Sequence, residues 1–339
     1  MIKKLLLLGC VATMIACTPA KQSTIDTILQ LRVDSILQNK MSEIDALSGQ
    51  AIVMEVQTGE IKAMVGNSIR QESGLIRTAS LLATLETGKV KLSDTVDVGE
   101  GVYKVHDREL LDHNWHRGGY GKLTTLQGLM VNSHIANYKN IERAFTEEQA
   151  YFDMLNKMSY GQPENIEGLD SLKAAYFVTP NDSGWNNTSL AWFCIGYNQR
   201  ISPIQMLTFY NAIANNGKMV KPTLYKGKTE IINPQIASKA NIDSLQMALV
   251  KVVTEGLGKP AQSEKVQVAG VSGGSQISTE EDNSEGRVNT IYSVEYCGYF
   301  PAENPKYSII VSINKVGLPA SGNLMAGSVF KEIVDYMTK

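Results

Sequence analysis

Strand-like segments stand at both ends of this 339-residue chain, and helical segments fill the middle, which restricts the folds that the chain can adopt. Near the N-terminus, residues 51–56 and 61–65 are apolar runs around a Thr-Gly turn, which is typical of a hairpin. Near the C-terminus, further strand patterns occupy residues 266–270, 292–300 and 307–313. We therefore expect an α+β domain whose antiparallel sheet is built from both ends of the chain.

Helical periodicity accounts for much of the remainder. Residues 24–47 carry one apolar stripe, and Gly49 is expected to end that helix. Residues 123–145 predict a second long helix. Another helix begins at Ser202, which is followed by a proline at the first helical position and by Gln205, the partner residue of a capping box.

The N-terminus has the pattern of an export signal. Two lysines precede an apolar run that ends at Cys17 and is too short for a stable transmembrane helix. Together with the small residue before Cys17, this pattern resembles a bacterial lipoprotein signal. We therefore expect residues 1–17 to be a signal peptide that ends at a lipidated Cys17. A tether over residues 18–23 and one domain over residues 24–339 would follow.

Two alternatives to this interpretation of the N-terminus remain open. The chain could carry a conventional signal peptide in which Cys17 is incidental. Cys10 is a weaker lipidation candidate because the apolar stretch before it is shorter. The formal net charge of −2 gives no reason to expect nucleic acid or an anionic membrane as a partner.

Two cysteines lie in the body of the chain, and each is embedded in an apolar run. Cys194 and Cys297 are expected to be buried free thiols rather than a disulfide, because a pair distant in sequence must meet a narrow geometry. Their spacing does not match a zinc site.

Five segments match one protein family in both sequence and order. They are residues 51–64 (AIVMEVQTGEIKAM), 81–97 (LLATLETGKVKLSDTVD), 201–222 (ISPIQMLTFYNAIANNGKMVKP), 297–308 (CGYFPAENPKYS) and 329–336 (VFKEIVDY). Together they resemble the transpeptidase domain of class B penicillin-binding proteins, especially the cell-division type. The resemblance implies the penicilloyl-serine transferase (β-lactamase/transpeptidase-like) fold. That fold has a five-stranded antiparallel sheet with helices on both faces plus a helical subdomain, and its active site lies between sheet and subdomain.

The family's first motif supplies a nucleophilic serine at a helix start and a lysine one turn later. Counting back from Glu86-Thr87-Gly88 places Gly74 at the serine position and Arg77 at the lysine position. Gly74 has no atom to acylate, and Arg77 stays protonated, so it cannot act as a base. Ser73 is an alternative nucleophile one residue earlier, but no base is visible beside it in the sequence.

The family's second motif, Ser-x-Asn, provides a hydroxyl for proton relay and an amide that binds substrate. The matching positions here are Asn132, Ser133 and His134. Asn132 cannot relay a proton as a hydroxyl does. His134 could replace the hydrogen bond of the asparagine, or it could be a helix-surface histidine satisfied by solvent.

The third motif, Lys-Thr/Ser-Gly-Thr, holds the substrate carboxylate and lines the oxyanion hole. The matching positions are Val271, Ser272, Gly273 and Gly274, so the cation is missing. Ser272 and Gly273 would still allow a peptide to lie against the strand. Arg77 could supply a positive charge from the opposite wall.

A metal site is a further possibility in the middle of the chain. His106, Asp112, His113 and His116 are close in sequence, and the last two have a spacing at which two ligands can meet one ion. The family needs no metal, and the set of ligands is incomplete. We therefore expect neither a metal nor another cofactor.

Because all three motifs have lost their central groups, we expect a catalytically inactive homologue of the transpeptidases. It would be a lipoprotein of a double-membrane bacterium, facing the periplasm or lying in the outer membrane, that binds peptidoglycan stem peptides or cell-wall and division proteins. The expected ligand-binding residues are Arg77, Asn132, Ser133, His134, Ser272, Gly273 and Gly274. The alternative is an active D,D-transpeptidase or carboxypeptidase with unconventional catalytic residues.

Overall fold

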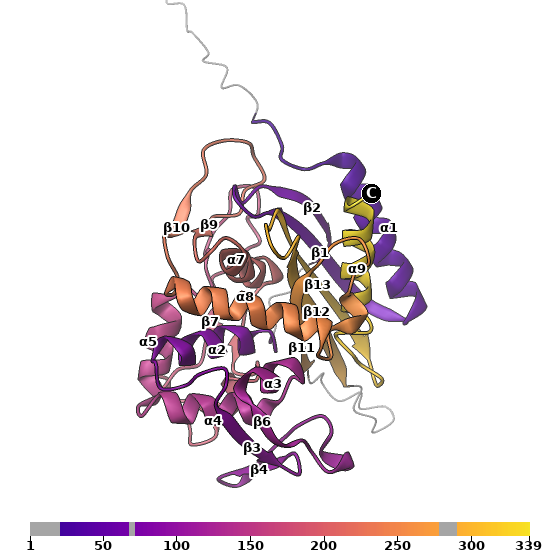
Figure 1. The fold of residues 1–339 in the computed structure, drawn as a ribbon. Coiled ribbons are helices and arrows are strands. Elements are labelled where there is room, and N and C mark those ends of the chain that lie inside the picture. The colour runs from indigo at the N-terminus through magenta and orange to yellow at the C-terminus, as the bar shows by residue number, and fades with distance from the viewer. Residues whose placement is uncertain (1–20, 68–71, 278–289) are drawn as a thin grey trace, which may run out of the picture.

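The computed structural model describes residues 21–67, 72–277 and 290–339 of the chain (Figure 1). The predicted signal peptide, Cys17 and residues 18–20 of the predicted tether lie outside the described residues. Within the described ranges, no helix is both long and apolar enough to cross a membrane.

A five-stranded antiparallel sheet joins the two ends of the chain. Its strand order is β11 (Ala269–Ile277), β12 (Ile291–Phe300), β13 (Tyr307–Val316), β1 (Ala46–Glu55) and β2 (Ile61–Gly66). The N-terminal hairpin enters the sheet where β1 pairs with β13, with Ile52 opposite Ile310. The predicted α+β class and the sheet assembled from both termini are confirmed.

Helices cover both faces of this sheet, because successive strand residues point to opposite sides and both sets are apolar. Val53 and Ile309 pack toward α1 (Thr27–Glu43) and α9 (Ala326–Met337), which lie side by side on one face. Their neighbours along the strands face the other core, which α7 (Pro203–Ala214) and α8 (Lys239–Thr254) cover (Figure 1).

The middle of the chain forms a helical subdomain beside α8 (Figure 1). Its helices are α2 (Ile76–Glu86), α3 (Thr125–Met130), α4 (His134–Ala144), α5 (Glu148–Lys157) and α6 (Ser189–Phe193). Four short antiparallel strand pairs lie in this subdomain and near α7. The first two are β3 (Thr95–Gly99) with β6 (Gly121–Thr124) and β4 (Val102–Val105) with β5 (Arg108–Leu111). The other two are β7 (Tyr176–Phe177) with β8 (Gln199–Arg200) and β9 (Met219–Val220) with β10 (Ile231–Asn233). Short 3-10 turns span Trp115–Arg117 and Lys259–Ala261.

The prediction of one helix over residues 123–145 is wrong, and the chain there forms α3 and α4 instead. Thr124 and Gln127 make a capping box that starts α3 after the end of β6. Asn132 then adopts a left-handed backbone with a φ of +59°, and Ser133 caps α4. The apolar periodicity bridges the break, so it hid these two caps.

Two other helix boundaries can be compared with their predictions. The first helix ends at Glu43, earlier than predicted, and Gly49 lies inside β1 rather than at the helix end. The predicted start of α7 is confirmed, because Ser202 and Gln205 form a reciprocal capping box.

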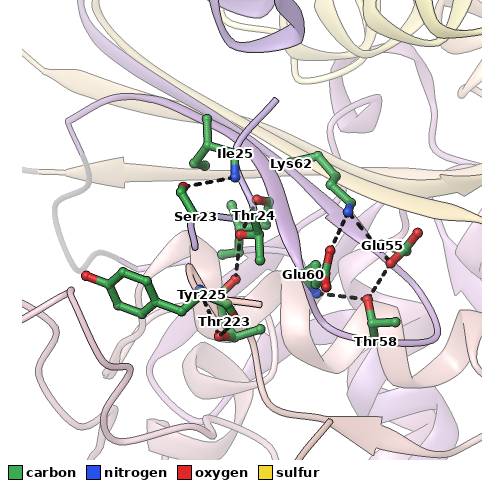
Figure 2. Close-up of polar contacts among 10 residues, drawn as sticks. Ser23, Thr24, Ile25, Glu55, Thr58, Glu60, Lys62, Thr223 and Tyr225 are labelled. Carbon is green, nitrogen blue, oxygen red and sulfur yellow. Dashed lines mark hydrogen bonds and ion pairs between the residues drawn. The ribbon is translucent and has the colours of Figure 1, made fainter. Parts of the chain in front are cut away.

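Polar contacts fasten the N-terminal segment to the body of the domain (Figure 2). The buried Thr24 hydroxyl lies 2.8 Å from the carbonyl oxygen of Ile61 and 3.1 Å from that of Thr223. Beside it, the Lys62 ammonium pairs with Glu60 at 2.5 Å and lies 3.8 Å from Glu55 (Figure 2). The Thr24 contacts hold the N-terminal segment beside the β2 edge of the sheet, whereas the Lys62 ion pairs lie within the β1–β2 hairpin.

Cys194 and Cys297 are both buried and free, as predicted. Burial raises the pKa of each thiol well above its ordinary value, so both stay protonated and behave as small apolar side chains.

Candidate functional site

The start of α2 packs directly against the backbone of the edge strand β11. A Cβ atom placed on Gly74 would lie 2.6 Å from the carbonyl oxygen of Gly274 and 2.8 Å from its nitrogen. Both contacts are with backbone atoms, which cannot move aside as a flexible side chain can. Gly74, which we predict to stand at the family's nucleophile position, therefore has no room for a side chain.

Two further glycines make this contact possible. A Cβ atom on Gly196 would lie 2.7 Å from the nitrogen of Gly74 and from the carbonyl group of Ser73, and Gly196 has a φ of +118°. A Cβ atom on Gly273 would lie 2.8 Å from the nitrogen of Leu75. Three segments distant in sequence thus meet backbone to backbone, which only glycine allows.

Ser73, the alternative nucleophile, is buried in the same contact with an exposed fraction of 1%. Its hydroxyl lies 2.5 Å from a carboxylate oxygen of Glu295, a buried residue of β12. Its carbonyl oxygen accepts a hydrogen bond from the side chain of Gln199 at 2.9 Å. Glu295 is a carboxylate that sequence reasoning missed, because nothing local links β12 to the start of α2. The Ser73 hydroxyl fastens α2 to the sheet.

The guanidinium group of Arg77 lies beside Gly74, next to the place that a side chain at Gly74 would occupy. Its Nη1 atom would be 3.1 Å from a Cβ on that glycine, and the residue is only 5% exposed. Burial lowers the pKa of Arg77 to about 10, while the negative charges of Asp112 and Glu295 partly oppose the shift. The side chain therefore remains protonated at neutral pH, and it cannot serve as a general base.

Ser133 has a structural role at the start of α4. Its hydroxyl accepts a hydrogen bond from the Ala136 N–H at 3.0 Å and donates to Asp112 at 2.7 Å. The second carboxylate oxygen of Asp112 accepts a hydrogen bond from the Ile135 N–H at 3.2 Å. Both groups are buried, and Ser133 does not reach the surface where a ligand could bind.

His134 is half-buried on the first turn of α4 rather than satisfied only by solvent. Its Nδ1 atom lies 3.0 Å from the carbonyl oxygen of Leu111, so this nitrogen carries the proton and Nε2 is left as an acceptor. Burial, followed by the positive charge of Arg77, lowers the pKa of His134 to about 3. The imidazole is therefore neutral at physiological pH.

A groove of about 620 Å³ lies where the predicted binding residues meet. One wall carries Arg77, Asn132 and His134, and β11 contributes Ser272, Gly273 and Gly274. Six of the seven predicted ligand-binding residues thus lie together, and the seventh, Ser133, is buried outside the groove. Val271, at the predicted position of the third motif's cation, is also buried outside it.

The loop over residues 320–324, between β13 and α9, forms part of the groove, and sequence reasoning missed it. A Cβ atom on Gly322 would lie 2.6 Å from the carbonyl oxygens of Gly273 and Glu295, so this glycine brings the loop onto the sheet. The sequence Ala-Ser-Gly-Asn there is typical of any surface loop.

The side chains of the four residues considered as metal ligands contact other protein groups or solvent. Asp112 is used at the start of α4, and the His113 ring lies 3.0 Å from the Tyr120 hydroxyl. His116 makes an edge contact with Trp115, and His106 is exposed in a turn. In the described part of the chain, no three His, Cys, Asp or Glu side chains are grouped closely enough to hold an ion.

Comparison with known families identifies the family to which this fold belongs. The pattern described as the penicillin binding protein transpeptidase domain matches residues 49–335, which is most of the chain. The chain belongs to the penicillin-binding protein transpeptidase family. The predicted family is therefore confirmed.

Relatives within the family are distant in sequence. The penicillin-binding protein PbpB of Mycolicibacterium smegmatis is 24% identical over 357 residues, which cover 93% of this chain and 54% of the relative. The peptidoglycan D,D-transpeptidase FtsI of Escherichia coli K12 is 20% identical over 328 residues, which cover 90% of this chain and 53% of the relative. The chain thus spans about half the length of these relatives.

The fold is shared with solved transpeptidase structures. The TP domain of penicillin-binding protein 3 from Burkholderia pseudomallei superposes with a TM-score of 0.79 at 21% identity, covering 93% of this chain and 95% of that one. Penicillin-binding protein 3 of Mycobacterium tuberculosis gives a TM-score of 0.77 at 21% identity, covering 94% of this chain and 78% of that one. The predicted transpeptidase-like fold is confirmed.

The Gly74→Ser substitution tests whether the nucleophile position is closed. We expect it to lower the free energy of unfolding by about 1–3 kcal/mol, because the new side chain must displace the backbone of Gly274. Urea denaturation measures the change. Gly184→Ser is the matched control, since a Cβ there meets no atom within 4 Å. A Gly74→Ser protein as stable as the control would contradict the closed contact.

The lowered pKa of His134 predicts a pH dependence of stability. Between the ordinary value of 6.5 and about 3, the unfolded chain binds a proton at His134 that the folded protein does not. The free energy of unfolding should therefore fall as the pH drops from 6.5, and His134→Gln should reduce this fall. Denaturation at several pH values measures it, with the exposed His116→Gln as control. Identical pH profiles for His134→Gln and the wild-type protein would refute the assignment.

Proposed function

We propose that this chain is a catalytically inactive member of the transpeptidase family. The observation that carries the proposal is Gly74, which has no nucleophilic atom and leaves no room for one against Gly274. Arg77 replaces the base with a group that stays charged. Residual stabilisation from positioning alone would not support useful turnover once both groups are gone.

The names of the relatives favour the alternative, an active enzyme. Several carry names of peptidoglycan D,D-transpeptidases, and Ser73 lies within hydrogen-bond distance of the carboxylate of Glu295. A serine beside a carboxylate is a possible nucleophile and base. Against this alternative, Ser73 is buried and does not line the groove.

Labelling with a fluorescent β-lactam separates the two functions. We expect no covalent adduct by intact-protein mass, because an acyl-enzyme requires an accessible nucleophile. A transpeptidase domain that retains the serine is labelled in parallel as the positive control. An adduct that maps to Ser73 and disappears in Ser73→Ala would instead support the active enzyme.

We propose further that the protein acts by binding in the cell envelope. Two relatives are named peptidoglycan D,D-transpeptidases. These names support the stem peptides of peptidoglycan, or proteins of the cell wall, as partners of this chain. The lipoprotein-like sequence that ends at Cys17 supports a lipid anchor and a position facing the periplasm or in the outer membrane.

The anchor is tested by replacing its cysteine. Cys17→Ser should abolish incorporation of a radiolabelled fatty acid and shift the protein from the membrane to the soluble fraction, because the acylated thiol is lost. Cys10→Ser is the matched control and should keep both properties. Lipid labelling that persists in Cys17→Ser would show that residues 1–17 do not end in the acylated residue.

A further inference from the structure

Exposed lysines gather at the end of the domain where the N-terminal segment enters. This segment lies there beside the loop between β9 and β10 and the end of α9, at the top of Figure 1. Four exposed lysines belong to these three segments: Lys21, Lys226, Lys228 and Lys339. The net charge of the whole chain, −2, conceals this local concentration of positive charge.

Most of these lysines have no acidic partner. Within residues 21–67, 72–277 and 290–339, no ion pair includes Lys226, Lys228 or Lys339. Acidic side chains nearby are used otherwise: Asp26 caps α1, Glu167 faces Lys21, Glu230 faces Lys221, and Glu55 and Glu60 face Lys62. The three lysines are therefore available to an anionic partner from outside the protein.

A hollow of about 850 Å³ lies among the same segments. Lys62, Lys226 and Lys339 contribute to its lining, together with the ring of Tyr336. The Lys339 ammonium lies 4.7 Å from the centre of this ring, and the guanidinium carbon of Arg32 on α1 lies 5.6 Å from it. Cations from β2, the β9–β10 loop and the end of α9 therefore border one open hollow.

The first two turns of α1 add exposed apolar side chains to this end. Ile28 lines the hollow and is 72% exposed, and Leu31 is 67% exposed. Residues three apart lie on the same face of a helix, so these two side chains are neighbours. Lysines beside a small apolar surface suit the face of a bilayer, where apolar side chains enter the interface and lysines meet anionic headgroups.

The chain between this end and the proposed lipid anchor is short. Lys21 follows Cys17 by four residues, so their Cα atoms are at most about 14 Å apart. An acyl chain on Cys17 would therefore hold the lysines close to the bilayer surface, where the Debye length is about 8 Å at physiological salt. The attraction to anionic lipid then acts within one tethered molecule, which raises the effective concentration.

We propose that this end of the domain docks on the anionic phospholipids of a bilayer, with Lys226, Lys228 and Lys339 on the headgroups and Ile28 and Leu31 at the apolar boundary. The inference rests on the proposed lipid anchor and adds a second contact that orients the domain. Among the described residues, the hollow and the groove share none of their lining, and β3 and β4 of the helical subdomain lie at the opposite end of Figure 1. Docking thus leaves the groove residues clear of the bilayer.

Lysine labelling on vesicles tests this orientation. The protein, expressed from its full coding sequence, is bound to preformed vesicles of neutral phosphatidylcholine or of phosphatidylcholine mixed with anionic phosphatidylglycerol. An acetylating reagent then modifies accessible amines, and mass spectrometry measures the rate at each lysine. We expect Lys226, Lys228 and Lys339 to react at least about fivefold more slowly on the anionic vesicles, because the headgroups cover them. Lys104, exposed on β4, should react equally on both.

Charge reversal provides a matched pair of variants. Lys226→Glu with Lys228→Glu should bring the two rates at Lys339 within about twofold of each other, because the attraction to the headgroups is lost. Both side chains are exposed, and no hydrogen bond in the described structure uses them, so the double variant should fold. Lys104→Glu with Lys122→Glu makes the same change of charge on the helical subdomain and should keep the protection of Lys339.

Several outcomes would overturn the inference. Equal rates at Lys339 on the two kinds of vesicle would do so, as would protection that survives Lys226→Glu with Lys228→Glu. Slow labelling without vesicles would show that a second copy or another protein segment covers this surface instead of lipid.

Flotation with the neutral vesicles reports the lipid anchor separately. Protein that floats with them but shows no protection on anionic vesicles would support the anchor and overturn the docking surface. Protein that floats only with anionic vesicles and is protected there would contradict the anchor and support the docking surface. Protein that floats with neither would overturn both.

Discussion

The backbone contact between the start of α2 and β11 controls the rest of the site. In this fold the groove lies between a helical subdomain and one edge of a sheet, so the spacing of these two elements decides what can bind. Gly74, Gly196 and Gly273 let three distant segments touch without intervening side chains. Ser73 and Glu295 add a buried hydrogen bond across the same contact. This contact is therefore built from several residues at once, and replacing one glycine by serine would not by itself open a space between α2 and β11.

The positive charge of Arg77 determines the chemical character of this wall of the groove. Arg77, which we predict to stand at the family's base position, stays protonated at neutral pH, because burial lowers its pKa only to about 10. The same positive charge contributes to holding His134 neutral, since it disfavours a second cation nearby. Among the residues that the structure describes, this wall of the groove has one fixed cation, Arg77, beside the neutral hydrogen-bonding groups of Asn132 and His134. Such a wall is suited to holding an anion, and it is unsuited to moving protons.

The sequence predicted the sheet, the family and six residues that meet in the groove, because strand periodicity and motif spacing are local signals. Ser202 and Gln205 predicted a helix start for the same reason. The break at Asn132 was missed because apolar periodicity continues across it, and the caps at Thr124 and Ser133 are short-range features that the stripe obscured. Contacts of Glu295 with Ser73 and of the 320–324 loop with β11 join distant segments, and no pattern in one stretch of sequence encodes them.

The fold and the catalytic groups depend on different parts of the chain. Stability comes from apolar strand faces such as Ile52 and Ile310, buried under helices on both sides, and the polar residues Ser73, Asn132 and Ser272 of the motif segments are not part of that apolar core. Catalytic side chains can consequently be replaced without loss of the fold. A relic under no demand would be free to fill its groove with apolar side chains, which would remove the cost of burying Arg77. That a buried cation remains there, with unpaired amides around it, favours a groove that still binds a ligand.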